Sequence, residues 1–149
     1  MKRNMTRAAG IAGVVCAIPV LFAGAAQADP GTQYFSVGST QCAILGNGTV
    51  GCDLSAPTPL MYGRLPFPLP VSEIVIDSRW LPAHPTFDPG TPYTRPGGNP
   101  PLEEVKTGDG PWGPIIEHAG AECSVGFHGT FSCTAHDRSW STWSGMITA

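Results

Sequence analysis

The chain contains few charged residues, and this scarcity excludes several classes of partner. Asp, Glu, Lys and Arg make up 13% of the 149 residues, and only eight residues are Lys or Arg. Nucleic acids and anionic membrane surfaces are bound largely through Lys and Arg. We therefore expect no nucleic-acid partner, and no attachment to a membrane once any leader is removed.

Motifs for catalysis and metal binding are also lacking. The sequence has no G-x-S-x-G elbow, no H-E-x-x-H pair and no C-x2-C pair. No window combines sustained helical periodicity with helix caps, which argues against a helical bundle. We predict no catalytic residue, no metal ligand and no cofactor.

The long apolar run at the N-terminus has the form of a secretory signal. Basic residues precede an uncharged stretch over residues 8–26, and Ala26-Gln27-Ala28 places small residues at a cleavage site. The length of the run leaves a transmembrane anchor as an alternative. Lipidation at Cys16 is another, although Val15 is larger than the residue that normally precedes a lipidated cysteine.

We predict a signal peptide over residues 1–28 and one secreted domain over residues 29–149, located outside the cell or in the cell envelope. The mature chain has 121 residues, of which five are basic and eleven acidic, and a formal charge of −6. It keeps four cysteines, and an even number in an exported chain predicts two disulfides.

An internal repeat indicates how these cysteines pair. Residues 42–52 (CAILGNGTVGC) align without gaps on residues 123–133 (CSVGFHGTFSC), with the shared pattern C-x-[IV]-x3-G-T-[VF]-x-C. The pattern is typical of a tight β-hairpin whose strands begin and end on a cysteine. The predicted disulfides are Cys42–Cys52 and Cys123–Cys133.

The turn glycine sets the register of each hairpin. A three-residue loop that ends on Gly48 in the left-handed region places Ile44 opposite Val50 and Cys42 opposite Cys52. Both are then the closer, non-hydrogen-bonded pairs of the ladder and lie on one face. We expect that face to be buried, and the same register to hold in the second copy.

Other segments complete an all-β prediction. We expect strands over residues 32–37, 72–80 and 139–148, and one helical turn over residues 103–106. Residues 55–118 hold most of the prolines, so we predict a long Pro-rich loop there with one strand near residues 72–80. The predicted fold is a small antiparallel sheet, sandwich or barrel built on two disulfide-bridged hairpins.

The first hairpin resembles a family of uncharacterised small exported actinobacterial proteins. Their signature is a phenylalanine, a short Ser/Gly segment, a cysteine, and then G-x-V-x-C-D-[IL], which residues 35–54 match. The usual Ser-Gly-Asn before the first cysteine is absent. The resemblance implies export and a disulfide hairpin, and it implies no activity and no site residue.

Two weaker patterns lie in the second half of the chain. The segment 127–133 (FHGTFSC) is similar to the His-Gly-Thr and cysteine of L,D-transpeptidases, but its His-to-Cys gap is shorter and no arginine follows Cys133. Five potential metal ligands have no ligand-like spacing, and we interpret them as surface residues. They are His118, Glu122, His128, His136 and Asp137.

Aromatic residues are the remaining candidates for function. Four of them could form a binding surface, because aromatic side chains dominate interface energies. They are Trp80, Tyr93, Trp112 and Trp143. The alternation of a strand puts Trp140 and Trp143 on opposite faces.

We predict a non-catalytic exported module that binds a cell-envelope component or an extracellular protein, with a small exported hydrolase or cell-wall enzyme as the alternative. Equally open is the possibility that the aromatic residues of the Pro-rich region only pin that loop to the sheet.

Overall fold

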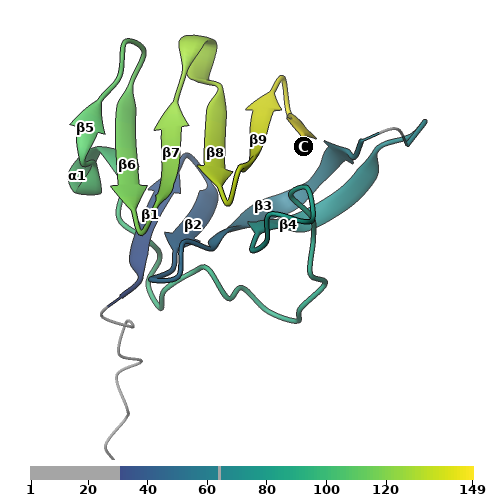
Figure 1. Cartoon of the computed structure of the whole chain (residues 1–149), viewed down its shortest axis with the longest axis horizontal. Helices are drawn as coiled ribbons and strands as arrows, with labels where there is room; N and C mark the ends of the chain where they lie inside the picture. Colours follow the sequence, from purple (N-terminus) through teal and green to yellow (C-terminus); the bar gives the residue numbers. More distant parts are fainter. Residues whose placement is uncertain (1–30, 64) are drawn as a thin grey trace, which may run out of the picture.

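The computed structural model describes residues 31–63 and 65–149, and nearly all regular structure there is β (Figure 1). The predicted signal peptide lies outside the described residues. Within them no helix has the length and apolarity to cross a membrane. The elements are β1 (Gln33–Val37), β2 (Thr40–Ile44), β3 (Val50–Met61), β4 (Leu69–Ile76), α1 (Leu102–Val105), β5 (Gly108–Asp109), β6 (Pro114–His118), β7 (Ala121–Val125), η1 (Phe127–Gly129), β8 (Phe131–Ala135), β9 (Arg138–Trp143) and β10 (Met146–Thr148).

The strands form one sheet that curls into a half-barrel, which confirms the all-β prediction. The strand order is β1-β2-β3-β10-β9-β8-β7-β6-β5, and β4 pairs with β3. The long strand β3 joins the two halves, because its second part pairs in parallel with β10 through Leu60 and Ile147. The half formed by β1–β4 therefore faces the half formed by β6–β10 (Figure 1).

Both disulfide hairpins have the predicted register. Cys42 lies opposite Cys52 and Cys123 lies opposite Cys133, with Cα–Cα distances of 4.1 Å in each pair. The turn glycines have the expected left-handed conformation, with φ of +82° and +76°. They are Gly48 and Gly129.

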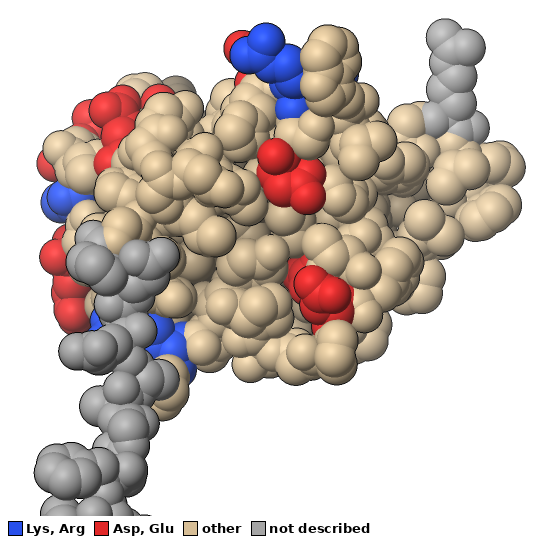
Figure 2. Space-filling view, turned by 60° about the horizontal axis from the view of Figure 1, so that its bottom comes forward, with Lys and Arg blue, Asp and Glu red and all other residues tan. Residues whose placement is uncertain are grey.

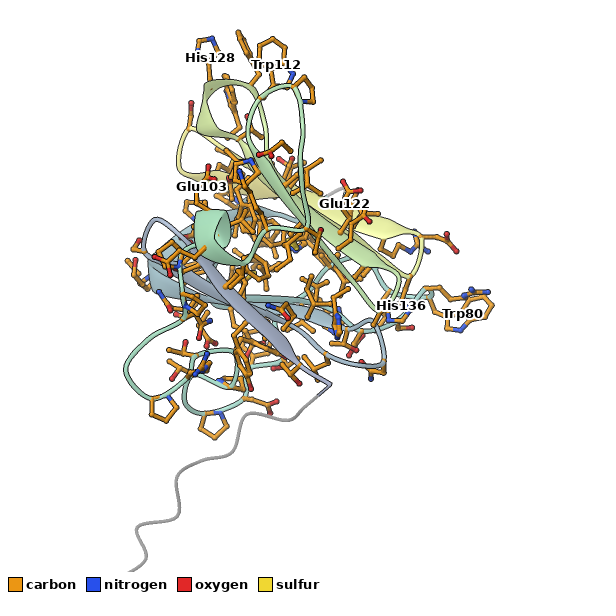
Figure 3. All side chains as sticks on the ribbon, turned by 90° about the vertical axis from the view of Figure 1, so that its left-hand side faces the viewer. Trp80, Glu103, Trp112, Glu122, His128 and His136 are labelled. Atoms are coloured by element: carbon orange, nitrogen blue, oxygen red, sulfur yellow. A yellow bond between two sulfur atoms is a disulfide. The ribbon has the colours of Figure 1, made fainter. Side chains whose placement is uncertain are left out.

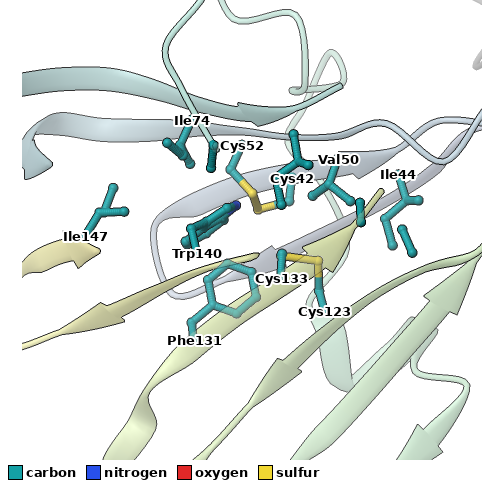
Figure 4. Close-up of a cluster of buried hydrophobic side chains, with 14 of the residues drawn as sticks. Cys42, Ile44, Val50, Cys52, Ile74, Cys123, Phe131, Cys133, Trp140 and Ile147 are labelled. Atoms are coloured by element: carbon teal, nitrogen blue, oxygen red, sulfur yellow. A yellow bond between two sulfur atoms is a disulfide. The ribbon is translucent and has the colours of Figure 1, made fainter. Parts of the chain in front are cut away.

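Each disulfide lies in the middle of a buried row that crosses four strands. The rows are Phe35–Cys42–Cys52–Ile74 and Ile116–Cys123–Cys133–Trp140. The two rows face each other and form the core (Figure 4). Between them the Phe131 ring lies 6.2 Å from Phe35 and 5.2 Å from Trp140, both in edge-to-face contact, which is a favourable geometry for aromatic pairs.

The region that sequence predicted as one Pro-rich loop with a strand is more ordered than expected. Strand β3 continues to Met61, and the predicted strand over residues 72–80 begins earlier and ends earlier, at Leu69 and Ile76. The sheet tolerates these prolines because Pro59 lies opposite Pro70, so neither strand offers an N–H at that pair. Two further strands, β5 and β6, lie between residues 108 and 118.

Residues 77–101 form the actual long loop, and it covers the outer face of β2–β4. The Tyr93 ring packs on Gly51, where an added Cβ would come within 2.1 Å of the ring. Asn99 fixes the end of the loop, because its side-chain amide donates to the carbonyls of Phe35, Cys42 and Tyr93. Figure 2 brings the lower side of Figure 1 forward and shows a face with few charged groups.

Candidate functional site: an exposed aromatic cluster

Four aromatic side chains lie together where the loops of β5–β6, β7–β8 and β9–β10 meet. We call this set the tip cluster: Trp112, Phe127, His128 and Trp143. Ring centroids are separated by 4.8 Å between Trp112 and Phe127, and by 6.3 Å between His128 and Trp143. Two loops and the end of strand β9 therefore contribute to one surface, at the top of Figure 1.

A tight turn places Trp112 in the cluster. The Gly110 N–H donates to the Gly113 carbonyl at 2.8 Å, which closes a turn with Pro111 and Trp112 at its centre. Proline favours the first central position of such a turn. Gly113 lies so close to Val125 that an added Cβ would come within 3.0 Å of its carbonyl oxygen. The absence of a side chain at Gly113 lets the turn approach β7, and Trp112 reaches Phe127.

The loop of the second hairpin supplies the middle of the cluster. Phe127 and His128 occupy the short η1 segment, which is closed by hydrogen bonds from Gly129 to Gly126 and from Thr130 to Phe127. His128 has a φ of +56°, a conformation that non-glycine residues adopt rarely and histidine adopts more often than most. This backbone turns both rings toward solvent.

Strand alternation supplies the fourth ring, as sequence predicted. Trp140 is 1% exposed and packs in the core, whereas Trp143 is 56% exposed. A separation of three residues in β9 puts the two indoles on opposite faces of the sheet. The tip cluster thus has one ring from a strand and three from loops.

The cluster is accessible, and its segments lack carboxylate, Lys and Arg side chains. Trp112 is 62% exposed and Phe127 is 52% exposed. Residues 110–113, 126–130 and 143–145 contain no Asp, Glu, Lys or Arg. Exposed apolar groups gathered in one patch are typical of interaction sites. The absence of Asp, Glu, Lys and Arg favours a ligand that is itself neutral at the point of contact.

Two of the four predicted binding residues lie away from this cluster. Trp80 is 82% exposed and lies away from Trp112 (Figure 3). Its neighbour Arg79 contacts Asp137 and Arg138 at the β8–β9 turn, which is at the other end of β8 and β9 from the cluster. Tyr93 is half-buried on Gly51 and holds the loop against the sheet. The structure therefore brings together Trp112 and Trp143, and it gives Tyr93 the pinning role that sequence left open.

Phe127 and His128 were missed as site residues because the hairpin pattern explained the second copy as a scaffold, and His128 was interpreted only as a surface residue. The alignment of the two copies carries the relevant signal. Phe127 and His128 align with Gly46 and Asn47 of the first copy. Two aromatic residues in place of the usual small turn residues indicate a role beyond the turn.

Buried carboxylates lie beneath the long loop and not in the cluster. Asp53 and Glu73 are opposite each other on β3 and β4, and both are buried. Asp53 accepts hydrogen bonds from the Tyr93 N–H and the Thr94 hydroxyl, and Glu73 accepts two from Thr86. Burial raises the pKa of Asp53, and the neighbouring Glu73 adds to the rise.

The same environment affects Tyr93. Burial, followed by the charges of Glu73 and Asp53, raises the pKa of Tyr93 to about 12. Asp53 and Tyr93, the two groups with a raised pKa, lie where the long loop packs on the sheet. Their position indicates a structural role, which is to fix the loop to the sheet. Among residues 31–63 and 65–149, no three His, Cys, Asp or Glu side chains are grouped to hold a metal ion.

Comparison of the chain with protein-family models, with curated proteins and with solved structures gave no match. The resemblance of residues 35–54 to small exported actinobacterial proteins stays a prediction.

Proposed function

We propose that the protein is an exported, non-catalytic module that binds a cell-envelope component or an extracellular protein through the tip cluster. The observation that carries the proposal is the gathering of four exposed rings, from two loops and the end of strand β9, on one surface without Asp, Glu, Lys or Arg. Leaving such an area of apolar surface in water costs free energy that a partner would recover.

Rigidity of the scaffold supports a binding role. The rings stand on short turns between strands, and the hairpin below them is closed by the Cys123–Cys133 disulfide. A surface that is ordered before binding loses little conformational entropy when a partner arrives. Two disulfides are also compatible with an extracellular protein.

The test compares matched tryptophans. The purified secreted chain is incubated with isolated cell envelopes and with secreted proteins of the producing organism, and the retained fraction is measured. The Trp112→Ala/Trp143→Ala variant should lose about tenfold or more of its retention, as expected for anchors of an interface. Trp80→Ala is the control, because Trp80 is even more exposed but lies outside the cluster.

Equal retention of the two variants would contradict the proposal for the tip cluster. Melting temperatures of all three proteins should agree, which separates lost binding from lost folding. Export itself is tested by mass spectrometry of culture supernatant, where we expect a chain that begins at Asp29. A membrane-retained chain that still begins at Met1 would contradict it.

A further inference from the structure

The outer face of β7–β10 carries a row of hydroxyl groups next to the tip cluster. One residue from each strand lies in register, and the row is Ser124–Ser132–Ser141–Thr148. The Ser124 and Ser132 hydroxyl oxygens are 3.4 Å apart. Since neighbouring strands are about 4.8 Å apart, the row presents a hydroxyl at a regular short interval.

A second row and a depression extend this surface. Thr134 lies opposite Ser139 on β8 and β9, two residues along each strand from the first row, and on β7 the row ends at the exposed carboxylate Glu122. A shallow depression of about 400 Å³ lies over both rows and is lined mainly by their side chains. We call the surface made by the two rows the hydroxyl face: Ser124, Ser132, Ser141, Thr148, Thr134 and Ser139.

The hydroxyl face and the tip cluster are continuous. Side chains alternate along β9, so Ser139, Ser141 and Trp143 point to the same side, opposite to buried Trp140. Trp143 is the next residue after Ser141 on this side of β9. A ligand that lies on Ser141 can therefore also contact the indole of Trp143. No Lys or Arg belongs to either set of residues.

Comparison with the first hairpin shows that the fold does not require these hydroxyls. Ser124 and Ser132 align with Ala43 and Gly51 of the first copy. Ala43 and Gly51 are buried under the loop of residues 77–101. The same two positions thus carry small apolar residues where a loop covers them and hydroxyls where the sheet is bare.

These groups together fit the chemistry of a sugar chain. A pyranose ring has C–H groups that pack on the negative face of an aromatic ring. Its hydroxyls both donate and accept hydrogen bonds, and Ser and Thr hydroxyls can act as either the acceptor or the donor. A lipid surface would use the rings but not the hydroxyl rows, and an acidic polymer would require cations that the face lacks.

Building on the proposed function, we propose that the ligand is a neutral polysaccharide, which lies along the hydroxyl face with one end stacked on Trp143 and the tip cluster. The experiment measures binding of the secreted chain by affinity gel electrophoresis and calorimetry. The probes are pullulan, laminarin, galactomannan and xylan, with polygalacturonate as a charged polymer and phosphatidylcholine vesicles as a lipid surface.

We expect at least one neutral polymer to bind and neither polygalacturonate nor the vesicles to do so. Ser132→Ala/Ser141→Ala should weaken that binding about tenfold, the size expected for two lost neutral hydrogen bonds. The matched control is Ser39→Ala/Ser55→Ala, which removes an exposed pair of bonded serine hydroxyls outside the face and should leave binding unchanged. Melting curves check that all variants fold.

Three results would overturn the inference: no neutral polymer binds, the charged polymer or the vesicles bind as well, or the Ser132→Ala/Ser141→Ala variant binds like the control. If the tip cluster still retains the chain on envelopes or on a secreted protein, the proposed function stands without this ligand. If Trp112→Ala/Trp143→Ala also has no effect there, both fail.

Discussion

The two disulfide hairpins have the same register, the same buried row and the same turn glycine, yet their surroundings differ. The loop of residues 77–101 covers the outer face of the first hairpin, whereas the aligned Ser124 and Ser132 on the outer face of the second are partly exposed. The first tip has Gly46-Asn47, and Gly48 lies against the carbonyl of Ala119. The second tip holds Phe127-His128 in solvent.

The repeated pattern therefore specifies a scaffold and not a binding site. Cysteines, β-branched or aromatic pairs and a left-handed glycine satisfy the needs of the hairpin in both copies. At positions that the hairpin itself does not constrain, the residue type matches the surroundings. The residue is small where a loop covers it, and polar or aromatic where it is exposed to solvent. The following variants test that division.

The largest expected difference in stability is between variants of the two tryptophans of β9. Trp140→Ala should lower the free energy of unfolding by about 3–5 kcal/mol, because it leaves a large cavity between the two disulfide rows. Trp143→Ala should change it by less than about 0.5 kcal/mol, since the side chain is exposed. Urea denaturation measures both, and a large loss for Trp143→Ala would show that the tip cluster is structural.

Removal of each disulfide tests whether the two copies are equivalent as scaffolds. Cys42→Ala/Cys52→Ala and Cys123→Ala/Cys133→Ala should each cost about 2–4 kcal/mol, because both bridges span the same sequence separation of 10. Guanidinium denaturation of the two variants gives the values. A difference of more than about 2 kcal/mol would mean that the covering loop makes the first hairpin independent of its bridge.

Exchange of aligned residues tests the difference in covering directly. Gly51→Ser, which copies the second hairpin into the first, should cost about 1–3 kcal/mol because the new side chain displaces the Tyr93 ring. It should also expose residues 77–101 to limited proteolysis. The reciprocal Ser132→Gly should cost about 0.5–1 kcal/mol, the ordinary penalty of glycine in a strand, and should leave proteolysis unchanged.

If proteases cleave residues 77–101 of Gly51→Ser no faster than those of the unaltered protein, the role given to Tyr93 is wrong. A cost for Ser132→Gly as large as that for Gly51→Ser would show that the second outer face is packed.

The smallest expected effect is on how the free energy of unfolding depends on pH, through the buried Asp53 under the long loop. The pKa of Asp53 is raised from 3.8 by burial and then by Glu73, so the folded protein binds this proton more tightly than the unfolded chain. Its contribution favours folding below the ordinary value and is lost as the pH rises through the raised pKa. Relative to Asp53→Asn, the unaltered protein should therefore lose stability from acid to neutral pH.

Denaturation at a series of pH values measures that slope. Asp88→Asn is the control, because Asp88 is an exposed carboxylate of the same loop. If Asp53→Asn and the unaltered protein show the same pH dependence, the environment assigned to Asp53 is wrong.

Much of the scaffold could be read from local chemistry. The repeat predicted both disulfides and the register, because a tight turn fixes which residues stand opposite each other. β-Branched residues predicted strand β4, and alternation predicted that Trp140 and Trp143 would separate. The repeat also extends upstream, where Phe35 and Ile116 each precede the first cysteine by seven residues, but only their apolar character is shared.

Other features depend on contacts between residues far apart in the chain. Neither the parallel pairing of β3 with β10 nor the packing of Tyr93 on Gly51, 42 residues away, leaves a periodic signal in sequence. The tip cluster is of the same kind, since Trp112 and Phe127 come from two loops and Trp143 from the end of β9, and these meet only when the sheet is assembled. Local propensity places residues on turns and faces, but only the closing of the sheet decides which turns become neighbours.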